Sequence, residues 1–425
     1  MLKFSILLNS STTMIIMILN FTFKIYLARE FPKESLIIYY TITDVFSLIL
    51  RFFVGYKDAL TTIYNQTKEQ LKVIRLFSIF FLLVIIIIAF ILLPLISNFY
   101  LPQKIENFDL SWWYVSLLFI SMNLVSYYGY IFLVTKHYKL ISAQDILKTI
   151  FWIFSIILLY NFIAMEANYK TLIYASILSN FSILAFLIYK QKQYLPKYSF
   201  FQLIGFKLPN FEDDTNSKFI RLTALASSNY FIYGLLLFAP VYVMLNNGNI
   251  KELGDFQVVA RSIYFALVSV FSWPIGRFMF PEFSSLIADK RYKTLDNIRS
   301  KFIKLLLLFG TILVVSCWLL SKLVISYIFP LEYIDSYKMI NILIVALPFV
   351  MYQNFSESVI KAVGNYKTNL IIKFAGVLFF VVLYLILDLF EIEFASIYAF
   401  VVGMFGIFII SLYYEFKIKK EWKNR

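Results

Sequence analysis

The sequence is poor in the residues that most catalytic and metal sites require. Its 425 residues include one cysteine, Cys317, and one histidine, His137. A single cysteine excludes a disulfide within the chain, and one histidine leaves no histidine–cysteine cluster for a metal. A glycine-rich phosphate loop and an HExxH motif are also missing. We therefore expect no catalytic residues, no metal and no cofactor, and we do not expect an enzyme.

Charged residues are scarce as well, at 15% of the chain, whereas hydrophobic residues make up 61%. This composition excludes an ordinary soluble domain. Apolar runs of about 20 residues, enough for a helix to cross the hydrocarbon core, recur throughout. We predict an all-α polytopic membrane protein with twelve transmembrane helices. The predicted spans are 4–27, 36–55, 76–97, 111–134, 147–165, 170–189, 219–245, 256–280, 302–329, 337–360, 368–388 and 394–415.

Positive charge predicts the orientation of these spans. The net charge is +14, and 28 of the 39 lysines and arginines fall on one set of alternating loops and helix ends. Eight fall on the opposite set. Because cytoplasmic segments carry the excess of lysine and arginine, we predict that both termini and the loop 190–218 are cytoplasmic. The net charge is thereby explained by membrane topology, and no nucleic-acid partner is expected.

The two halves of the sequence resemble each other. KEQLKVIR (68–75) aligns with YKTLDNIR (292–299), and HYK (137–139) aligns with NYK (365–367). Each half holds six predicted spans and starts on the same side, so the halves are predicted to be parallel repeats with substrate bound between them. We divide the chain into an N-terminal lobe (1–189), a cytoplasmic linker (190–218) and a C-terminal lobe (219–425) with a basic tail.

Two arginines in the predicted span 256–280 are candidate functional residues, because a charge within the hydrocarbon core is costly. Arg261 lies about two turns inside the span, where a water-filled cavity holding an anionic ligand and contact with the interface are equally good explanations. Arg277 lies near the predicted cytoplasmic end, so extension to the interface explains it better. Arg277 is kept as a candidate for substrate binding.

Two carboxylates are candidates for coupling transport to an ion or to membrane potential. Asp44 lies inside a predicted span and could exchange a proton if desolvation raised its pKa. Glu357 is the second candidate, although its i, i+4 spacing to Lys361 favours a structural ion pair. Lys373, near the start of the span 368–388, is expected to extend to the interface.

Several stretches resemble a known family. TFKIYLAREFPKESLIIYY and FFVGYKDAL look like the first two helices of polysaccharide flippases, of the O-antigen type, in the multidrug/oligosaccharidyl-lipid/polysaccharide (MOP) exporter superfamily. VVARSIY, followed by PEFSSL, is similar to that superfamily's eighth helix. SYIFPLEYIDSYKMI and AVGNYKTNL continue the similarity over nearly the whole chain.

The resemblance implies two six-helix lobes in a V around a central cavity lined mainly by helices 1, 2, 7 and 8. It also implies alternating access in a bacterial inner membrane, and an undecaprenyl-diphosphate-linked oligosaccharide as cargo. The arginine matching Arg261 faces the cavity in that family. Lys24 and Arg51 lie on helices that carry cations in the related peptidoglycan-precursor flippases, but their local motifs differ, so only the helix is carried over. Those flippases have about two more helices, so twelve spans favour the oligosaccharide branch.

Polar and aromatic residues near the expected cavity are candidates for sugar contacts, although simple packing explains the tyrosines slightly better. They are Asn229, Tyr230 and Tyr233 in the span 219–245, and Gln257 next to the span 256–280. The expected partners are the lipid-linked oligosaccharide, membrane lipids and other polysaccharide-assembly proteins, and the chain is expected to be a monomer.

Two other functions are weighed against the flippase. A multidrug cation antiporter of the same superfamily would favour a negatively charged cavity, so Arg51 and Arg261 argue against it while Asp44 and Glu357 support it. A membrane glycan polymerase or ligase is disfavoured, because no predicted outward loop exceeds about fifteen residues and no intramembrane histidine is present. The sequence thus predicts an exporter that moves a lipid-linked surface-polysaccharide unit across the inner membrane.

Overall fold

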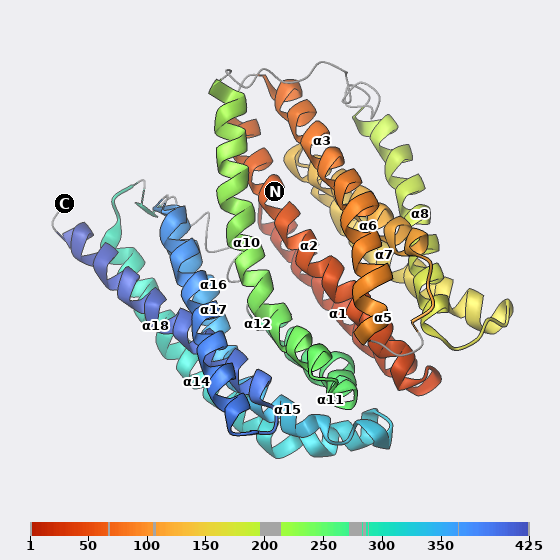
Figure 1. The fold of residues 1–425 in the computed structure, drawn as a ribbon. Helices are drawn as coiled ribbons and strands as arrows, with labels where there is room; N and C mark the ends of the chain where they lie inside the picture. Colours follow the sequence, from red (N-terminus) through yellow and green to blue (C-terminus); the bar gives the residue numbers. More distant parts are fainter. Residues whose placement is uncertain are drawn as a thin grey trace. The chain divides into compact units, whose positions relative to one another are not determined.

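The described chain is built from helices. A computed structural model covers residues 1–425, and it describes residues 2–66, 69–104, 108–195, 214–271, 289–363 and 365–423, with Phe283, Leu286 and Ile287. Within these residues there are helices and connecting segments and no strand. Long helices dominate the ribbon in Figure 1. The prediction of an all-α chain is confirmed.

Ten helical segments in the described residues are long and apolar enough to cross a membrane. They coincide with ten of the twelve predicted spans. The other two predicted spans, 4–27 and 256–280, include residues or side chains that the structure does not describe, so these two spans stay predictions. The many apolar helices make this a multi-pass membrane protein.

Several helices are longer than the predicted spans. α2 runs from Lys33 to Gln66 and α14 from Tyr292 to Ile328, whereas spans 36–55 and 302–329 were predicted. The helical turns outside the predicted spans carry most of the lysines and arginines of these two helices, as in YKTLDNIRSK at the start of α14. A hydropathy window ends where charged residues begin, but backbone hydrogen bonding can continue the helix through the interface and beyond.

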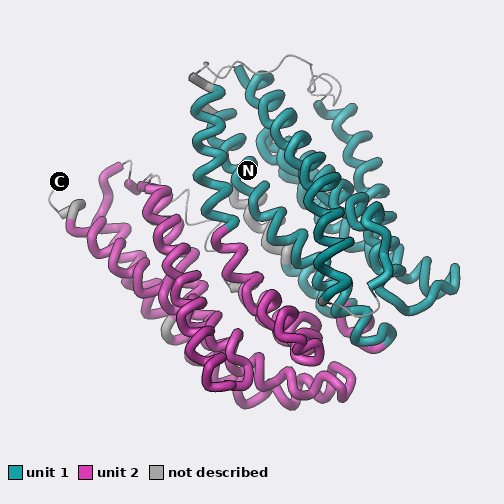
Figure 2. The backbone as a smooth tube through the Cα atoms, in the orientation of Figure 1, with its two compact units in different colours: residues 1–23, 30–231 teal, residues 24–29, 232–425 magenta. Residues whose placement is uncertain are grey.

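The chain forms two compact units, coloured separately in Figure 2. Unit 1 comprises residues 1–23 and 30–231, and unit 2 comprises residues 24–29 and 232–425. The first helix of each half, α1 (Leu2–Glu30) and α10 (Asp214–Asn246), contributes residues to both units. The predicted linker 190–218 lies largely outside the described residues, so the lobe boundaries proposed from the sequence stay a prediction.

The remaining helices of unit 1 pack around an aromatic core. The rings of Phe77 and Tyr127 stack with centroids 5.6 Å apart, and the hydroxyl of Tyr127 lies 2.7 Å from Ser78 Oγ. Besides α2, these helices are α3 (Gln70–Ile87), η1 (Ile88–Leu92), α4 (Leu93–Leu95), η2 (Ile96–Tyr100), α5 (Leu101–Lys104), α6 (Trp112–Val134), α7 (Tyr138–Ile157), η3 (Leu158–Phe162) and α8 (Tyr169–Tyr194).

The helices of unit 2 include a very close pair. A Cβ atom at Gly376 of α17 would overlap Ile407 of α18, and one at Gly403 would lie 2.9 Å from the carbonyl oxygen of Gly376. Small residues let membrane helices approach this closely. Besides α14, these helices are α11 (Ile250–Gly254), η5 (Asp255–Ala260), α12 (Arg261–Phe271), η6 (Leu331–Tyr333), α15 (Ser336–Leu343), η7 (Ile344–Ala346), α16 (Leu347–Ala362), α17 (Tyr366–Leu389) and α18 (Ala395–Lys423).

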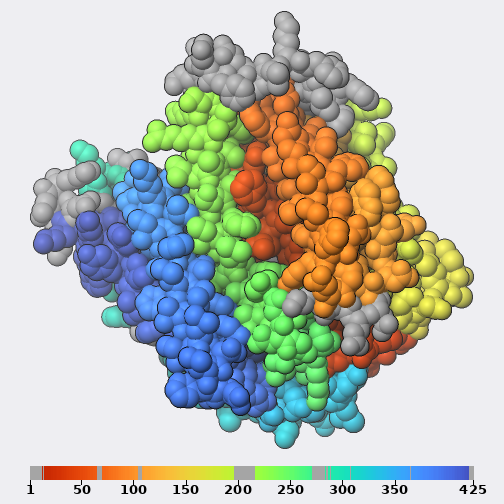
Figure 3. Space-filling view, in the orientation of Figure 1, coloured from red at the N-terminus to blue at the C-terminus, as the bar shows by residue number. Residues whose placement is uncertain are grey.

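Large apolar side chains cover long stretches of the helix surfaces. From α3 through η2, exposed residues include Leu83, Ile87, Phe90, Leu95 and Phe99. This segment is orange and faces the viewer in Figure 3. Apolar patches this extensive are rare on water-soluble monomers, so these surfaces are suited to face lipid.

Repeated sequence motifs occupy equivalent positions in the fold. α7 begins at Tyr138 after His137, and α17 begins at Tyr366 after Asn365. Both motifs therefore lie at the start of the helix that contains the fifth predicted span of a half. This agreement is expected of two halves with the same order of helices.

Candidate functional site

A π-helical segment in unit 2 leads directly into the predicted arginine. η5 covers Asp255–Ala260, and all six of its residues are buried. Its wider turns re-aim the side chains that follow, and π-helical segments occur often at functional sites. α12 then begins at Arg261. The sequence reasoning selected Gln257 and Arg261 but did not anticipate the π-helix that orients them.

Lys24 is held against this segment by a chain of hydrogen bonds. Lys24 Nζ donates to Ser262 Oγ over 2.7 Å, and Ser262 Oγ donates to the carbonyl oxygen of Gln257 over 3.1 Å. The half-buried guanidinium of Arg261 lies 5.8 Å from the ring centroid of Phe256. Three residues predicted separately, Lys24, Gln257 and Arg261, therefore belong to one local cluster.

Tyr264 is a residue of this region that sequence reasoning missed. It follows Arg261 by one turn of α12 and is 3% exposed. Its hydroxyl has no hydrogen-bond partner among the residues that the structure describes. The i, i+3 spacing in the RSIY motif was the available signal, since it places both side chains on one helix face.

A second charged cluster in unit 2 is centred on Glu357 of α16. Glu357 Oε1 lies 2.7 Å from Lys361 Nζ and 3.1 Å from Lys373 Nζ of α17. Lys373 is 1% exposed and lies 5.3 Å from the ring centroid of Tyr233 on α10. The expectation that Lys373 extends to the interface is wrong, because a carboxylate in the interior stabilises its ammonium instead. The ion pair expected between Glu357 and Lys361 is present.

Gln353 extends this second cluster. It lies one turn before Glu357 on α16 and is 3% exposed. Neither its amide nitrogen nor its amide oxygen has a hydrogen-bond partner among the described residues. A buried amide without partners is costly, so Gln353 is a further candidate contact for a polar ligand. The available signal in the sequence was a glutamine one helical turn before Glu357 within the predicted span 337–360.

The candidate residues of unit 1 are engaged with their neighbours. Tyr230 donates its hydroxyl to Asp58 Oδ2 over 2.7 Å, and Lys57 Nζ lies 3.5 Å from Asp58 Oδ1. Asn229 donates from Nδ2 to the carbonyl oxygen of Leu225 over 3.1 Å. Tyr230 therefore positions Asp58, and its contact with a sugar stays a prediction.

Asp44 and Arg51 lie on α2 in the same unit. Asp44 is 9% exposed, and Arg51 is half-buried. A glycine farther along α2 makes its close packing possible, since a Cβ atom at Gly55 would overlap the backbone of Ser227 on α10. Both charged residues thus lie on a helix that is tightly packed within unit 1.

The candidate residues are divided between the units. Asp44, Arg51, Asn229 and Tyr230 belong to unit 1, whereas Lys24, Tyr233, Gln257, Arg261 and Glu357 belong to unit 2. Arg277 lies outside the described residues. In the part of the chain that the structure describes, no group of three or more histidine, cysteine, aspartate or glutamate side chains could hold a metal ion.

Solved structures that resemble the chain are membrane transporters. An inward-facing multidrug resistance MATE family transporter of the MOP superfamily superposes with a TM-score of 0.78 at 14% identity, covering 99% of both chains. An outward-facing transporter of this kind gives 0.72 at 13% identity, covering 99% of this chain and 96% of that one. No family model and no curated protein matches the sequence.

The chain has the fold of the MATE transporters. The matched transporters are described as members of the MOP superfamily, the one that the sequence resembles, and their fold matches the predicted two-lobe arrangement. At this level of identity the MATE fold alone is shown. Both of these proteins are described as multidrug resistance transporters.

A third solved structure that resembles the chain is described by the polarity of its binding pocket. A MOP superfamily transporter from Pyrococcus furiosus superposes with a TM-score of 0.66 at 13% identity, covering 99% of this chain and 96% of that one. It is described as having a binding pocket of reverse polarity that suggests a different function.

Proposed function

We propose that the chain is an alternating-access transporter whose cargo is an anionic amphiphile, namely an undecaprenyl-diphosphate-linked oligosaccharide that it moves to the outer leaflet of a bacterial inner membrane. The MATE-like fold supports transport. The cargo is inferred from charge. The observation that carries it is the hydrogen-bonded link, through Ser262, from Lys24 to the π-helical segment that directly precedes Arg261.

The chemistry of this cluster suits a diphosphate. Arginine presents a planar fork that binds two oxygens at once and stays charged, and lysine adds a compact positive charge. With Asp255 included, the Lys24–Arg261 cluster still carries one more positive than negative charge. The Glu357 cluster, with Lys361 and Lys373, has the same excess. Buried amides such as that of Gln353 and nearby tyrosines would suit the hydroxyl groups and ring faces of sugars.

A multidrug cation antiporter is the second candidate, and the structural matches favour it. Its cargo would require a carboxylate that can face a cation. Asp44 and Asp255 are buried acidic residues that fit this role by residue type. The two candidates therefore predict opposite signs for the charge that selects cargo.

Reconstituted vesicles distinguish the two candidates. We expect the purified chain to flip a fluorescent short-chain prenyl-diphosphate saccharide and not to transport ethidium. Arg261→Ala should reduce saccharide flipping at least tenfold, and Arg261→Lys should retain part of it because positive charge remains. Lys322→Ala, a substitution in α14, is the matched control and should leave flipping unchanged. Transport of ethidium with no saccharide flipping would reject the flippase and favour the antiporter.

A further inference from the structure

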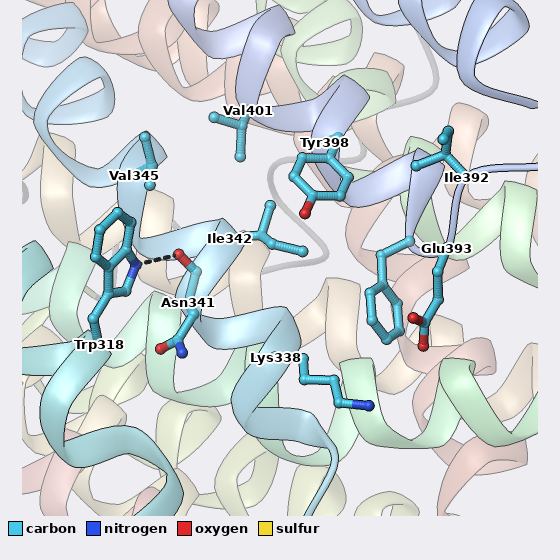
Figure 4. Close-up of a pocket in the computed structure, with 10 residues that line it drawn as sticks. Trp318, Lys338, Asn341, Ile342, Val345, Ile392, Glu393, Tyr398 and Val401 are labelled. Atoms are coloured by element: carbon cyan, nitrogen blue, oxygen red, sulfur yellow. Dashed lines mark hydrogen bonds between the residues drawn. The ribbon is translucent and has the colours of Figure 1, made fainter. Parts of the chain in front are cut away.

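A pocket of about 630 Å³ opens within unit 2, apart from both charged clusters. Its lining comes from α14, α15, η7, α18 and the connection between α17 and α18. Figure 4 shows Lys338 and Glu393 toward one end of the pocket and Trp318, Val345 and Val401 toward the other. The volume lies within the range of about 300–1,000 Å³ that is typical of small-molecule sites.

The polarity of the lining changes along the helices. Lys338 lies in the first turn of α15, and Glu393 lies in the connection just before α18. Trp318 is ten residues before the end of α14, a distance of roughly 15 Å along the helix. Val401 is six residues into α18, roughly 9 Å from its start. The pocket is therefore charged at the end nearest the connecting segments and apolar at the end within the spans. This polarity matches that of an amphiphile, which has a polar headgroup and an apolar chain.

The charged end presents both signs. Lys338 Nζ has one acidic neighbour, Asp335 Oδ1 at 3.5 Å, and both side chains are more than 40% exposed. Such an exposed pair is weak and can open for another anion. Glu393 lies near Glu252 of α11, and burial together with the charge of Glu393 raises the pKa of Glu252. A bound cation would relieve the repulsion between these two carboxylates.

The shape of the pocket is fixed by its own contacts. Trp318 Nε1 donates to the carbonyl oxygen of Asn341 over 2.7 Å, and Asn341 Oδ1 accepts from Ser321 Oγ over 2.8 Å. Phe394, which lines the pocket, has a φ of 59°. A left-handed backbone at a bulky residue costs free energy, and such residues cluster at ligand sites. The aromatic wall is therefore held in place before any ligand binds.

We infer that this pocket binds the headgroup and upper acyl chain of a zwitterionic bilayer phospholipid that carries a phosphate and a primary ammonium. Lys338 faces the phosphate, and Glu393 faces the ammonium. Tyr398 and Phe394 offer ring faces to the same ammonium. The acyl chain lies along Ile342, Val345 and Val401. Charge complementarity selects this occupant over an anionic lipid, because a phosphate alone would leave Glu393 without a counter-charge. The site is independent of the proposed cargo.

Native mass spectrometry of the purified full chain tests this assignment. Phosphatidylethanolamine and phosphatidylglycerol with identical acyl chains are titrated separately, and their apparent dissociation constants are compared. We expect phosphatidylethanolamine to bind at least fivefold more tightly. Glu393→Gln should remove that preference by weakening phosphatidylethanolamine alone, whereas Lys338→Gln should weaken both lipids.

Two variants serve as matched controls. Lys322→Gln and Glu391→Gln change a lysine and an exposed glutamate that do not line the pocket, and both should keep the fivefold preference. Equal binding of the two lipids by the unmodified chain would overturn the inference. So would a preference that survives in the Lys338→Gln/Glu393→Gln double variant, since the lipid would then bind elsewhere. Thermal unfolding midpoints within about 2 °C of the unmodified chain verify that each variant is folded.

Discussion

Removing the Glu357 carboxylate should destabilise the chain far more than removing either lysine beside it. Lys361 Nζ and Lys373 Nζ contact the same oxygen, Oε1 of Glu357, at 2.7 and 3.1 Å. The two ammonium nitrogens are therefore less than about 6 Å apart. In the substitution Glu357→Gln they lose their shared counter-charge and face each other in the protein interior.

The magnitude follows from this separation. Two like charges about 6 Å apart repel by about 3 kcal/mol at an effective dielectric constant of about 20. Removing one partner of a buried ion pair costs about 3–5 kcal/mol in measured cases. We expect Glu357→Gln to lower the free energy of unfolding by about 3–5 kcal/mol. In domains of about 150–250 residues, the size range of each compact unit, this lowers the unfolding midpoint by roughly 6 °C or more.

Lysine substitutions provide the contrast. Lys373→Met leaves the pair between Glu357 and Lys361, so its cost should be below about 2 kcal/mol, and methionine fills most of the vacated volume. The double variant Glu357→Gln/Lys373→Met should recover part of the lost stability, because only Lys361 remains and it lies at the end of α16.

Thermal unfolding of the detergent-purified variants, followed by intrinsic fluorescence, measures these differences. Lys322→Met, which removes a lysine outside the cluster, is the control for loss of one positive charge. If Glu357→Gln were as stable as the unmodified chain, or if Lys373→Met did not rescue it, the like-charge argument would be wrong. Packing around residue 357 would then determine stability.

Three further predictions concern coupling, pH and topology. Asp44→Asn should slow transport without abolishing it, whereas collapsing the potential with a K⁺ ionophore should stop it, because outward movement of a diphosphate is favoured by a potential negative inside. Transport that persists at zero potential and needs only a Na⁺ or pH gradient would reject this scheme. Glu252→Gln should raise the unfolding midpoint at pH 7, and the gain should shrink as the pH falls. The folded-state pKa of Glu252 is raised, so the folded chain holds its proton more tightly than the unfolded chain and loses stability as the pH rises through that pKa. Glu332→Gln, an exposed residue, is the control, and a gain that does not depend on pH would contradict the reasoning. A cysteine at position 210 should resist an impermeant thiol reagent in intact cells and react after lysis, whereas labelling in intact cells would reverse the predicted orientation.

Sequence periodicity and hydropathy predicted the helices well, because a helix in a bilayer must satisfy its own backbone hydrogen bonds and cover itself with apolar side chains. Both requirements are local, so ten predicted spans coincide with helices. Their ends were predicted less well, since α2 and α14 continue past the point where charged residues begin. The repeat motifs HYK and NYK, which contain Tyr138 and Tyr366, occur at corresponding helix starts, although the start of α7 lies nine residues before the predicted span 147–165.

The candidate sites were predicted only in part. Arg261, Lys24 and Gln257 could be selected singly because each is polar within or next to an apolar span. The family resemblance placed their helices around one cavity, but the bond from Lys24 to Ser262 could not be predicted, since it joins residues 238 positions apart. Lys373 was assigned to the interface because its position along a helix can be read from the sequence, whereas a buried carboxylate partner sixteen residues away cannot.

The sequence by itself determined that this chain is a multi-pass helical membrane protein with two similar halves, because burial in lipid acts on each segment separately. It also determined which charges would be costly within the membrane. The tertiary structure decided which of those charges neutralise one another, where the π-helix re-aims Arg261, and how α14, α15 and α18 enclose a pocket. These depend on contacts between residues far apart in sequence, and such contacts have no local signature.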